Sequence, residues 1–282
     1  TPPAPRKPKR RRHSCAEARS HGEDAVDVAE LLGPHGLLAQ QVSGFAPRLP
    51  QQQMAEAVAA ALEEGDTLVV EAGTGTGKTY AYLIPALLSG ARVIISTGTR
   101  HLQDQLYHQD LPMVRQALNT PVRTALLKGR GNYLCRYRLQ ATEQDGRLSS
   151  REQVAELHRI RAWAGRTRRG DIAEIPDVSE TSLIWPRVTS TVDNCLGQDC
   201  PQLADCFLAK ARREALAADV LVINHHLFCA DMAIKETGFA ELLPGAEAFI
   251  LDEAHQLPDI ATHFLGRSLS GRQLSELGRD TV

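Results

Sequence analysis

A glycine-rich loop between an apolar run and a helical segment constrains this chain more than any other feature. Residues 72–79 read Ala-Gly-Thr-Gly-Thr-Gly-Lys-Thr and match the pattern G-x-x-x-x-G-K-[ST], except that Ala72 replaces the first glycine. The run 67–71 before the loop favours a strand, and residues 80–88 after it have a helical pattern. This context predicts a nucleotide-binding P-loop rather than an accidental turn.

Each residue type in the loop has a physical role in holding phosphate. Glycines let the backbone turn so that its N–H groups point at phosphate oxygens, and the following helix adds the positive end of its dipole. Lys78 would supply charge to the β- and γ-phosphates, and the Thr79 hydroxyl would ligate Mg²⁺. The residues expected to bind ATP are Gly73, Thr74, Gly75, Thr76, Gly77, Lys78 and Thr79.

A pair of acids far downstream is the second candidate site. Residues 249–255 read Phe-Ile-Leu-Asp-Glu-Ala-His, so an apolar strand delivers both acids at its carboxyl end, where ligands bind in parallel sheets. We expect Asp252 to hold Mg²⁺, Glu253 to polarise the attacking water and His255 to lie behind them as a coupling residue. Acids after a strand also occur in solvated loops, but the P-loop upstream makes this pair informative.

Strand-like and helical segments alternate along most of the chain, which predicts an α/β fold with a parallel sheet. The alternation stops at residues 128–217, which look helical and polar and contain a cysteine cluster. We therefore expect residues 26–127 and 218–261 to form one sheet domain and residues 128–217 to be inserted into it. The predicted strands are 67–71, 92–96, 122–127, 219–223 and 248–251, and a helix is predicted at 99–107.

Composition and charge limit the possible classes of protein but do not indicate a function. The net charge of −2 gives no global nucleic-acid signal. Residues 1–25 hold a basic run without a following apolar stretch, so we interpret them as a disordered basic tail, with a nucleic-acid-binding arm as the alternative. No apolar run is long enough for a transmembrane helix, and we expect a cytoplasmic protein. Because the chain begins with Thr1, we expect it to be cut from a longer one.

The cysteines predict a metal or cluster site as the main alternative to simple burial. Cys195, Cys200 and Cys206 follow the spacing C-x4-C-x5-C, and Cys135 lies upstream. Four thiolates suit a [4Fe–4S] cluster, while the absence of paired C-x2-C motifs disfavours zinc without excluding it. The other two cysteines are interpreted as a buried core thiol, Cys229, and a free thiol, Cys15.

Basic and aromatic residues are interleaved around Cys135, and residues 128–139 contain no acid. This mixture favours contact with single-stranded DNA, since charges follow phosphates and rings stack on bases, over a solvated helix face. The candidates are Lys128, Arg130, Tyr133, Arg136, Tyr137 and Arg138. A second group of arginines, between residues 159 and 169, is interpreted as a solvated face.

Several stretches together resemble the DEAH-type superfamily 2 helicases, and more narrowly the DinG/YoaA-like branch of the XPD family of iron–sulfur DNA helicases. The resemblance implies a RecA-like P-loop sheet with an inserted, mainly helical iron–sulfur domain. It also implies that Cys135, Cys195, Cys200 and Cys206 ligate the cluster. The stretches are Glu71–Thr79, Ile94–Thr99, Leu127–Cys135, Asp193–Gly197 and Asp252–His255.

The resemblance extends to residues that motif spacing alone does not identify. Gln51 matches a glutamine that reads adenine. Thr97, Thr99 and Gln103 match a segment that contacts the DNA backbone, although either threonine could instead cap a helix. The pair Asn224-His225 matches a family segment, and we favour a structural histidine there.

The expected function is ATP hydrolysis coupled to 5′-to-3′ translocation on single-stranded DNA and to unwinding of forked DNA, with replication or repair proteins as partners. The chain ends without a second motor lobe, and residues 262–282 are interpreted as the start of an arch domain. The alternative is a truncated, catalytically weak iron–sulfur fragment that binds DNA or regulates. A zinc-stabilised P-loop ATPase acting on protein or RNA is the third candidate.

Overall fold

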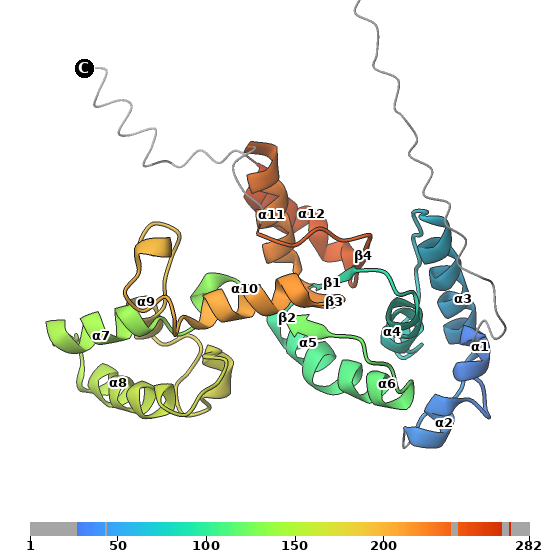
Figure 1. The fold of residues 1–282 in the computed structure, drawn as a ribbon, viewed down its shortest axis with the longest axis horizontal. Coiled ribbons are helices and arrows are strands. Elements are labelled where there is room, and N and C mark those ends of the chain that lie inside the picture. The colour runs from blue at the N-terminus through green and yellow to red at the C-terminus, as the bar shows by residue number, and fades with distance from the viewer. Residues whose placement is uncertain (1–26, 43, 238–241, 267–270, 272–282) are drawn as a thin grey trace, which may run out of the picture.

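A single parallel sheet organises the computed structural model, which describes residues 27–42, 44–237, 242–266 and 271 (Figure 1). Its four strands lie in the order β2-β3-β1-β4, which confirms the predicted parallel α/β fold and is consistent with a RecA-like domain. The basic tail 1–25, Cys15 and most of the expected arch segment lie outside the described residues. The strands are β1 (Val93–Thr97), β2 (Thr124–Leu126), β3 (Val220–Asn224) and β4 (Ala248–Leu251).

The two central strands, β1 and β3, are buried along their whole length. Helices cover both faces of the sheet, so these strands are almost continuously apolar instead of alternating with polar residues. Their register places Ile95 opposite Val222 on one side and opposite Ile250 of β4 on the other. The carboxyl ends of β1, β3 and β4 are thereby brought to one edge.

The first layer of helices packs on the sheet face formed by Val93, Ile95, Val220 and Val222. The helix after the P-loop, α4, is buried over most of its length, and α3 packs beside it. The helices of this half are α1 (Val28–Leu31), α2 (Leu37–Gln41), α3 (Leu49–Glu64), α4 (Lys78–Leu88), α5 (Arg100–Gln105) and α6 (Leu111–Ala117).

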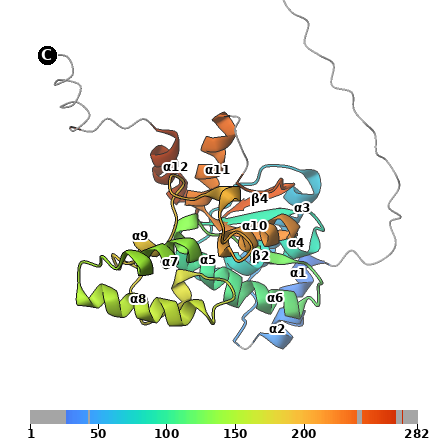
Figure 2. The ribbon, with the colours of Figure 1, turned by 60° about the vertical axis from the view of Figure 1, so that its left-hand side comes forward.

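The second layer comes from the chain between β2 and β3 (Figure 2). The opposite sheet face, with Ile94, Leu221 and Ile223, shares one apolar core with Trp163 and Trp185 of this segment. The segment therefore packs directly on the sheet. Its helices are α7 (Arg136–Asp145), α8 (Arg151–Ala164), α9 (Trp185–Val188) and α10 (Phe207–Ala217), joined by 3₁₀ turns at Arg130–Asn132, Ile172–Glu174 and Gly197–Asp199.

The last two helices, α11 (His225–Thr237) and α12 (Leu257–Leu265), pack against each other at the end of the sheet. His226 and Phe264 meet edge to face, with ring centroids 6.1 Å apart. A 3₁₀ turn, Ala254–Gln256, joins β4 to α12. Among the described residues, no helix has both the length and the apolar character that crossing a membrane requires.

Two elements differ from the sequence expectations. Residues 67–71 form no strand, and Val69 is 91% exposed. A run with strand propensity forms a strand only when a neighbouring strand hydrogen-bonds to its backbone. No strand of the sheet pairs with residues 67–71. The helix predicted at 99–107 is also interrupted, because a π-helical turn, Leu106–Asp110, follows α5 and leads into α6.

Removing core volume at the centre of the sheet tests the shared core. Ile223 of β3 is fully buried, so Ile223→Ala should lower the free energy of unfolding by about 3 kcal/mol. Urea unfolding followed by circular dichroism measures this change. Leu216→Ala, at an exposed position of α10, is the control and should stay within about 0.5 kcal/mol of wild type. Equal losses in the two variants would contradict the packing described.

Candidate nucleotide-binding site

The glycine loop ends in a conformation that other residues rarely adopt. Gly75 and Gly77 have φ angles of 78° and 82°, in the left-handed region that favours glycine. A Cβ at Gly77 would also overlap the side-chain amide of Gln51. Helix α4 begins at the next residue, Lys78, and Thr76 Oγ1 donates to the Gly73 carbonyl at 2.9 Å. The loop therefore presents a helix N-terminus of the kind that binds phosphate.

Gln51 supports this loop from α3. Its side chain is 2% exposed, and its Nε2 donates to the Gly77 carbonyl at 2.9 Å. Its Oε1 is buried without a hydrogen-bond partner among the described residues. This contact with the P-loop backbone was not predicted from the sequence. Adenine recognition by Gln51 stays a prediction.

The lysine of the loop and the downstream acids lie together. Lys78 Nζ is 3.2 Å from Glu253 Oε1 and 3.3 Å from the Ala72 carbonyl. Both side chains of the ion pair are about 29% exposed, so solvent can reach them. Since the acids follow β4, the contact lies at the carboxyl edge of the sheet, where parallel α/β proteins bind ligands.

Asp252 is more enclosed than its neighbour. The Tyr82 hydroxyl donates to its Oδ2 at 3.2 Å and also interacts with Thr79. Burial raises the pKa of Asp252, and the charge of Glu253 raises it further. Adjacent carboxylates beside a threonine hydroxyl form an oxygen donor set that suits Mg²⁺. Tyr82 was not singled out from sequence, although it lies one helical turn after Lys78.

The backbone of the acid pair is unusual at Glu253. Its φ and ψ of 55° and 43° are left-handed, which non-glycine residues seldom adopt. His255 Nδ1 lies 3.4 Å from Glu253 Oε2, but the His255 side chain is 70% exposed. His255 thus contacts Glu253 from the solvent side instead of lying behind the acids.

The histidine after β3 is structural, as expected, and it touches the acid turn. His225 is fully buried, with Nδ1 2.7 Å from Ser96 Oγ and Nε2 2.8 Å from the Asp252 carbonyl oxygen. Burial lowers the pKa of His225 and so favours the neutral ring. The preceding residue, Asn224, caps the start of α11 by accepting from the Leu227 N–H at 2.9 Å.

The segment expected to contact DNA is only partly accessible. Thr99 caps α5 by accepting from the Leu102 N–H at 3.2 Å, and it remains exposed. Thr97 is buried, and fully buried Gln103 donates to the Leu127 and Val222 carbonyls. The expectation of a DNA contact through the Gln103 side chain is therefore wrong, because that buried amide joins the residue after β2 to the middle of β3.

Comparison with known proteins agrees with this geometry. Residues 50–141 match the DEAD/DEAH box helicase family model. The chain is 56% identical to the ATP-dependent DNA helicase YoaA of Escherichia coli (strain K12) over 253 residues, and 51% identical to YoaA of Haemophilus influenzae. It is 37% identical over 278 residues to the ATP-dependent helicase DinG of Mycobacterium tuberculosis (strain H37Rv).

The chain is similar in sequence to the YoaA and DinG helicases. Each of these alignments covers 90% of the chain. The chain spans about 40% of the length of the relatives that it matches. The resemblance inferred from the motifs is confirmed at this level.

The four cysteines of the expected cluster are all half-buried and unpaired. Burial raises the pKa of Cys135, and interactions with Cys206 and Cys200 raise it further. Arg212 interacts with both Cys195 and Cys206. The thiols thus lie in one region, but no group of three His, Cys, Asp or Glu among the described residues is arranged to hold a metal ion. The core thiol expected at Cys229 is confirmed as buried.

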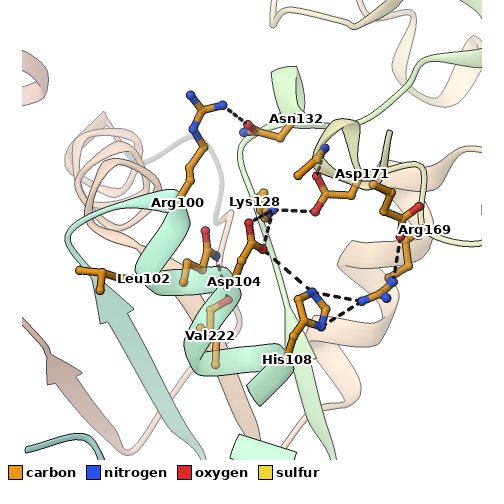
Figure 3. Close-up of polar contacts among 12 residues, drawn as sticks. Arg100, Leu102, Asp104, His108, Lys128, Asn132, Arg169, Asp171 and Val222 are labelled. Atoms are coloured by element: carbon orange, nitrogen blue, oxygen red, sulfur yellow. Dashed lines mark hydrogen bonds and ion pairs between the residues drawn. The ribbon is translucent and has the colours of Figure 1, made fainter. Parts of the chain in front are cut away.

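Lys128 is the largest departure from the sequence interpretation (Figure 3). This residue, expected to contact DNA, is 2% exposed. Its Nζ lies 2.7 Å from Asp104 Oδ1, 2.8 Å from Asp104 Oδ2 and 2.6 Å from Asp171 Oδ2. Because Asp104 belongs to α5 and Asp171 to the segment between β2 and β3, the ammonium group joins the two parts of the molecule.

Neighbouring residues extend this junction. Tyr133, also expected to contact DNA, is buried, and its hydroxyl accepts from the Lys128 N–H at 3.0 Å. Burial lowers the pKa of His108, and the charge of Arg169 lowers it further. The His108 ring lies 3.3 Å from Arg169 Nη1 (Figure 3). The interleaved basic and aromatic pattern therefore includes both residues buried at this junction and residues nearer the surface.

Breaking this junction should unfold the protein more readily. Lys128→Met leaves the buried Asp171 and the partly exposed Asp104 without their shared cation, so we expect a loss of about 3 kcal/mol in the free energy of unfolding. Chemical denaturation measures the loss. The control is Lys210→Met, whose ion pair with Glu214 is exposed and should contribute under about 1 kcal/mol. A loss at Lys128 no larger than at Lys210 would show that the buried ion pairs do not hold the junction.

Proposed function

We propose that this chain is the nucleotide-binding lobe of an ATP-dependent DNA helicase that carries an iron–sulfur module between β2 and β3. The observation that carries the proposal is the 3.2 Å contact between Lys78 of the P-loop and Glu253 of the acid pair at the carboxyl edge of a parallel sheet. The similarity to proteins named as ATP-dependent DNA helicases supports it.

The roles of the residues follow from their chemistry. The loop backbone and Lys78 bind the triphosphate, and Gln51 holds the loop in place. Thr79 and Asp252 would hold Mg²⁺, which supplies positive charge to the reacting phosphates. Glu253 orients the attacking water. Without nucleotide, Glu253 is the counter-ion of Lys78, so phosphate binding to Lys78 would release Glu253 for the water.

The second half of the proposal concerns the group that faces the γ-phosphate from outside this site. Hydrolysis in such motors uses an arginine that faces the γ-phosphate from a separate element. We therefore propose that a second lobe completes the site and that the present chain alone binds nucleotide weakly and hydrolyses it poorly. The substrate of the complete protein is single-stranded and forked DNA, with 5′-to-3′ movement and replication or repair proteins as partners.

The site is tested first by nucleotide binding. Lys78→Met should weaken binding of a fluorescent ATP analogue by about tenfold or more, because a charge-assisted contact to phosphate is lost. Glu253→Gln should preserve binding and slow single-turnover hydrolysis by about 10²-fold. The control is Lys235→Met, a lysine paired with Asp231 on α11, and its affinity should equal that of wild type. Equal affinities in all variants would exclude the P-loop as the binding site.

The electrostatic interactions of Cys135 with Cys200 and Cys206, and of Arg212 with Cys195 and Cys206, support the cluster part of the proposal. Cys135 would be the first ligand and Cys195, Cys200 and Cys206 the others. A bound cluster would cross-link the start of α7 to the segment before α10, and it could also respond to redox state. Four of the six candidates for contact with single-stranded DNA are half-exposed nearby and remain candidates: Arg130, Arg136, Tyr137 and Arg138.

Iron and sulfide analysis tests the cluster directly. Protein purified anaerobically should be brown and contain iron and acid-labile sulfide, and each of Cys135→Ser, Cys195→Ser, Cys200→Ser and Cys206→Ser should lower both. Cys229→Ala, at the buried thiol of α11, is the control and should retain both. A colourless protein containing zinc would replace the iron–sulfur proposal with the zinc alternative.

A further inference from the structure

We propose that His225 is a positioning residue for the acid pair and that it acts by fixing the peptide between Asp252 and Glu253. The inference rests on the proposed nucleotide site and deepens it. His225 touches neither acid side chain in the contacts described, and it contacts the backbone that carries them. Its role is therefore to hold the acids in place, without direct contact with the substrate.

The hydrogen bonds fix the state of the ring. The Asp252 carbonyl oxygen can only accept, so His225 Nε2, 2.8 Å away, carries the proton and donates it. In the neutral ring Nδ1 is then an acceptor, and the Ser96 hydroxyl, 2.7 Å away, donates to it. Ser96 and His225 are both fully buried, so water does not compete for either bond.

These contacts close a ring around Asp252. The Asp252 N–H donates to the Ser96 carbonyl at 2.9 Å, while the Asp252 carbonyl accepts from His225. Ser96 in turn orients His225 through its hydroxyl. Both backbone groups of Asp252 are thus held by Ser96 at the end of β1 and His225 at the start of α11, two residues that are themselves fully buried.

The peptide held in this way leads into the strained residue. Glu253 has a left-handed backbone, with φ of 55°, that a non-glycine residue adopts only when its surroundings impose it. That conformation is the one in which Glu253 Oε1 lies 3.2 Å from Lys78. Without the bond from His225, the Asp252–Glu253 peptide can rotate toward a relaxed conformation, and both carboxylates then leave the P-loop.

The experiment measures the metal and the nucleotide separately. Mn²⁺ is used in place of Mg²⁺, and its binding to the nucleotide-loaded chain is followed by electron paramagnetic resonance. His225→Ala should weaken Mn²⁺ binding by about tenfold, because the acids are no longer held in place. Affinity for a fluorescent ATP analogue in EDTA should change by less than about twofold, because the P-loop is intact.

Two further variants make the result specific to the hydrogen bond. His225→Gln keeps an N–H that can reach the Asp252 carbonyl and should recover most of the Mn²⁺ affinity. Ser96→Ala removes only the orienting hydroxyl and should weaken Mn²⁺ binding by about threefold. His226→Ala, at the exposed neighbouring position, is the matched control and should bind Mn²⁺ as wild type does.

The outcomes separate this inference from the nucleotide site itself. Wild-type Mn²⁺ affinity in a folded His225→Ala variant would overturn the positioning role. If that variant does not fold, Ser96→Ala decides, and wild-type affinity there would overturn it equally. Failure of the wild-type chain to bind the ATP analogue in EDTA and Mn²⁺ with it would refute the proposed function.

Discussion

The parallel pairing of β4 with β1 is the constraint on which the candidate site depends. The P-loop and the acid pair are far apart in the sequence, and they meet because Ile95 lies opposite Ile250 and Ser96 opposite Leu251. A register shift of one residue would turn the side chains of β4 to the other face. It would also move the Asp252 N–H away from the Ser96 carbonyl, to which it donates at 2.9 Å. The contact between Lys78 and Glu253 is therefore a consequence of strand register.

Three residues at the same edge of the sheet have left-handed backbone conformations. Gly75 and Gly77 use the left-handed region where a glycine adopts it freely, whereas Glu253 uses it with a side chain. Strain of this kind persists when the surrounding structure over-determines it and is common at functional sites. Here the buried contacts of Asp252 with Ser96 and His225 provide that surrounding structure. The glycine loop adopts the left-handed conformation because glycine has no side chain, whereas the acid turn adopts it because neighbouring residues impose it.

Sequence reasoning anticipated the structure where a pattern is local. The P-loop, the acids after β4 and the alternation of strands and helices all depend on short-range patterns, and four of the five predicted strands are present in the sheet. It failed where a residue's role depends on distant partners. Lys128, Tyr133 and Gln103 look like surface residues in the sequence, yet each is buried by groups from other elements. The prediction of a strand at residues 67–71 was wrong for the opposite reason: the run has strand propensity, but no strand of the sheet pairs with it.

The junction around Lys128 attaches the segment between β2 and β3 firmly to the sheet and α5. A buried ammonium group shared by Asp104 and Asp171 is directional, while the apolar core behind it, with Ile94 and Trp163, is not. Together they fix the orientation of the segment on the sheet as well as its attachment. Asp104 lies next to Gln103, which donates to the carbonyls of Leu127, just after β2, and of Val222, in the middle of β3. A displacement of α5 would therefore reach β2, β3 and the cysteine-bearing segment together.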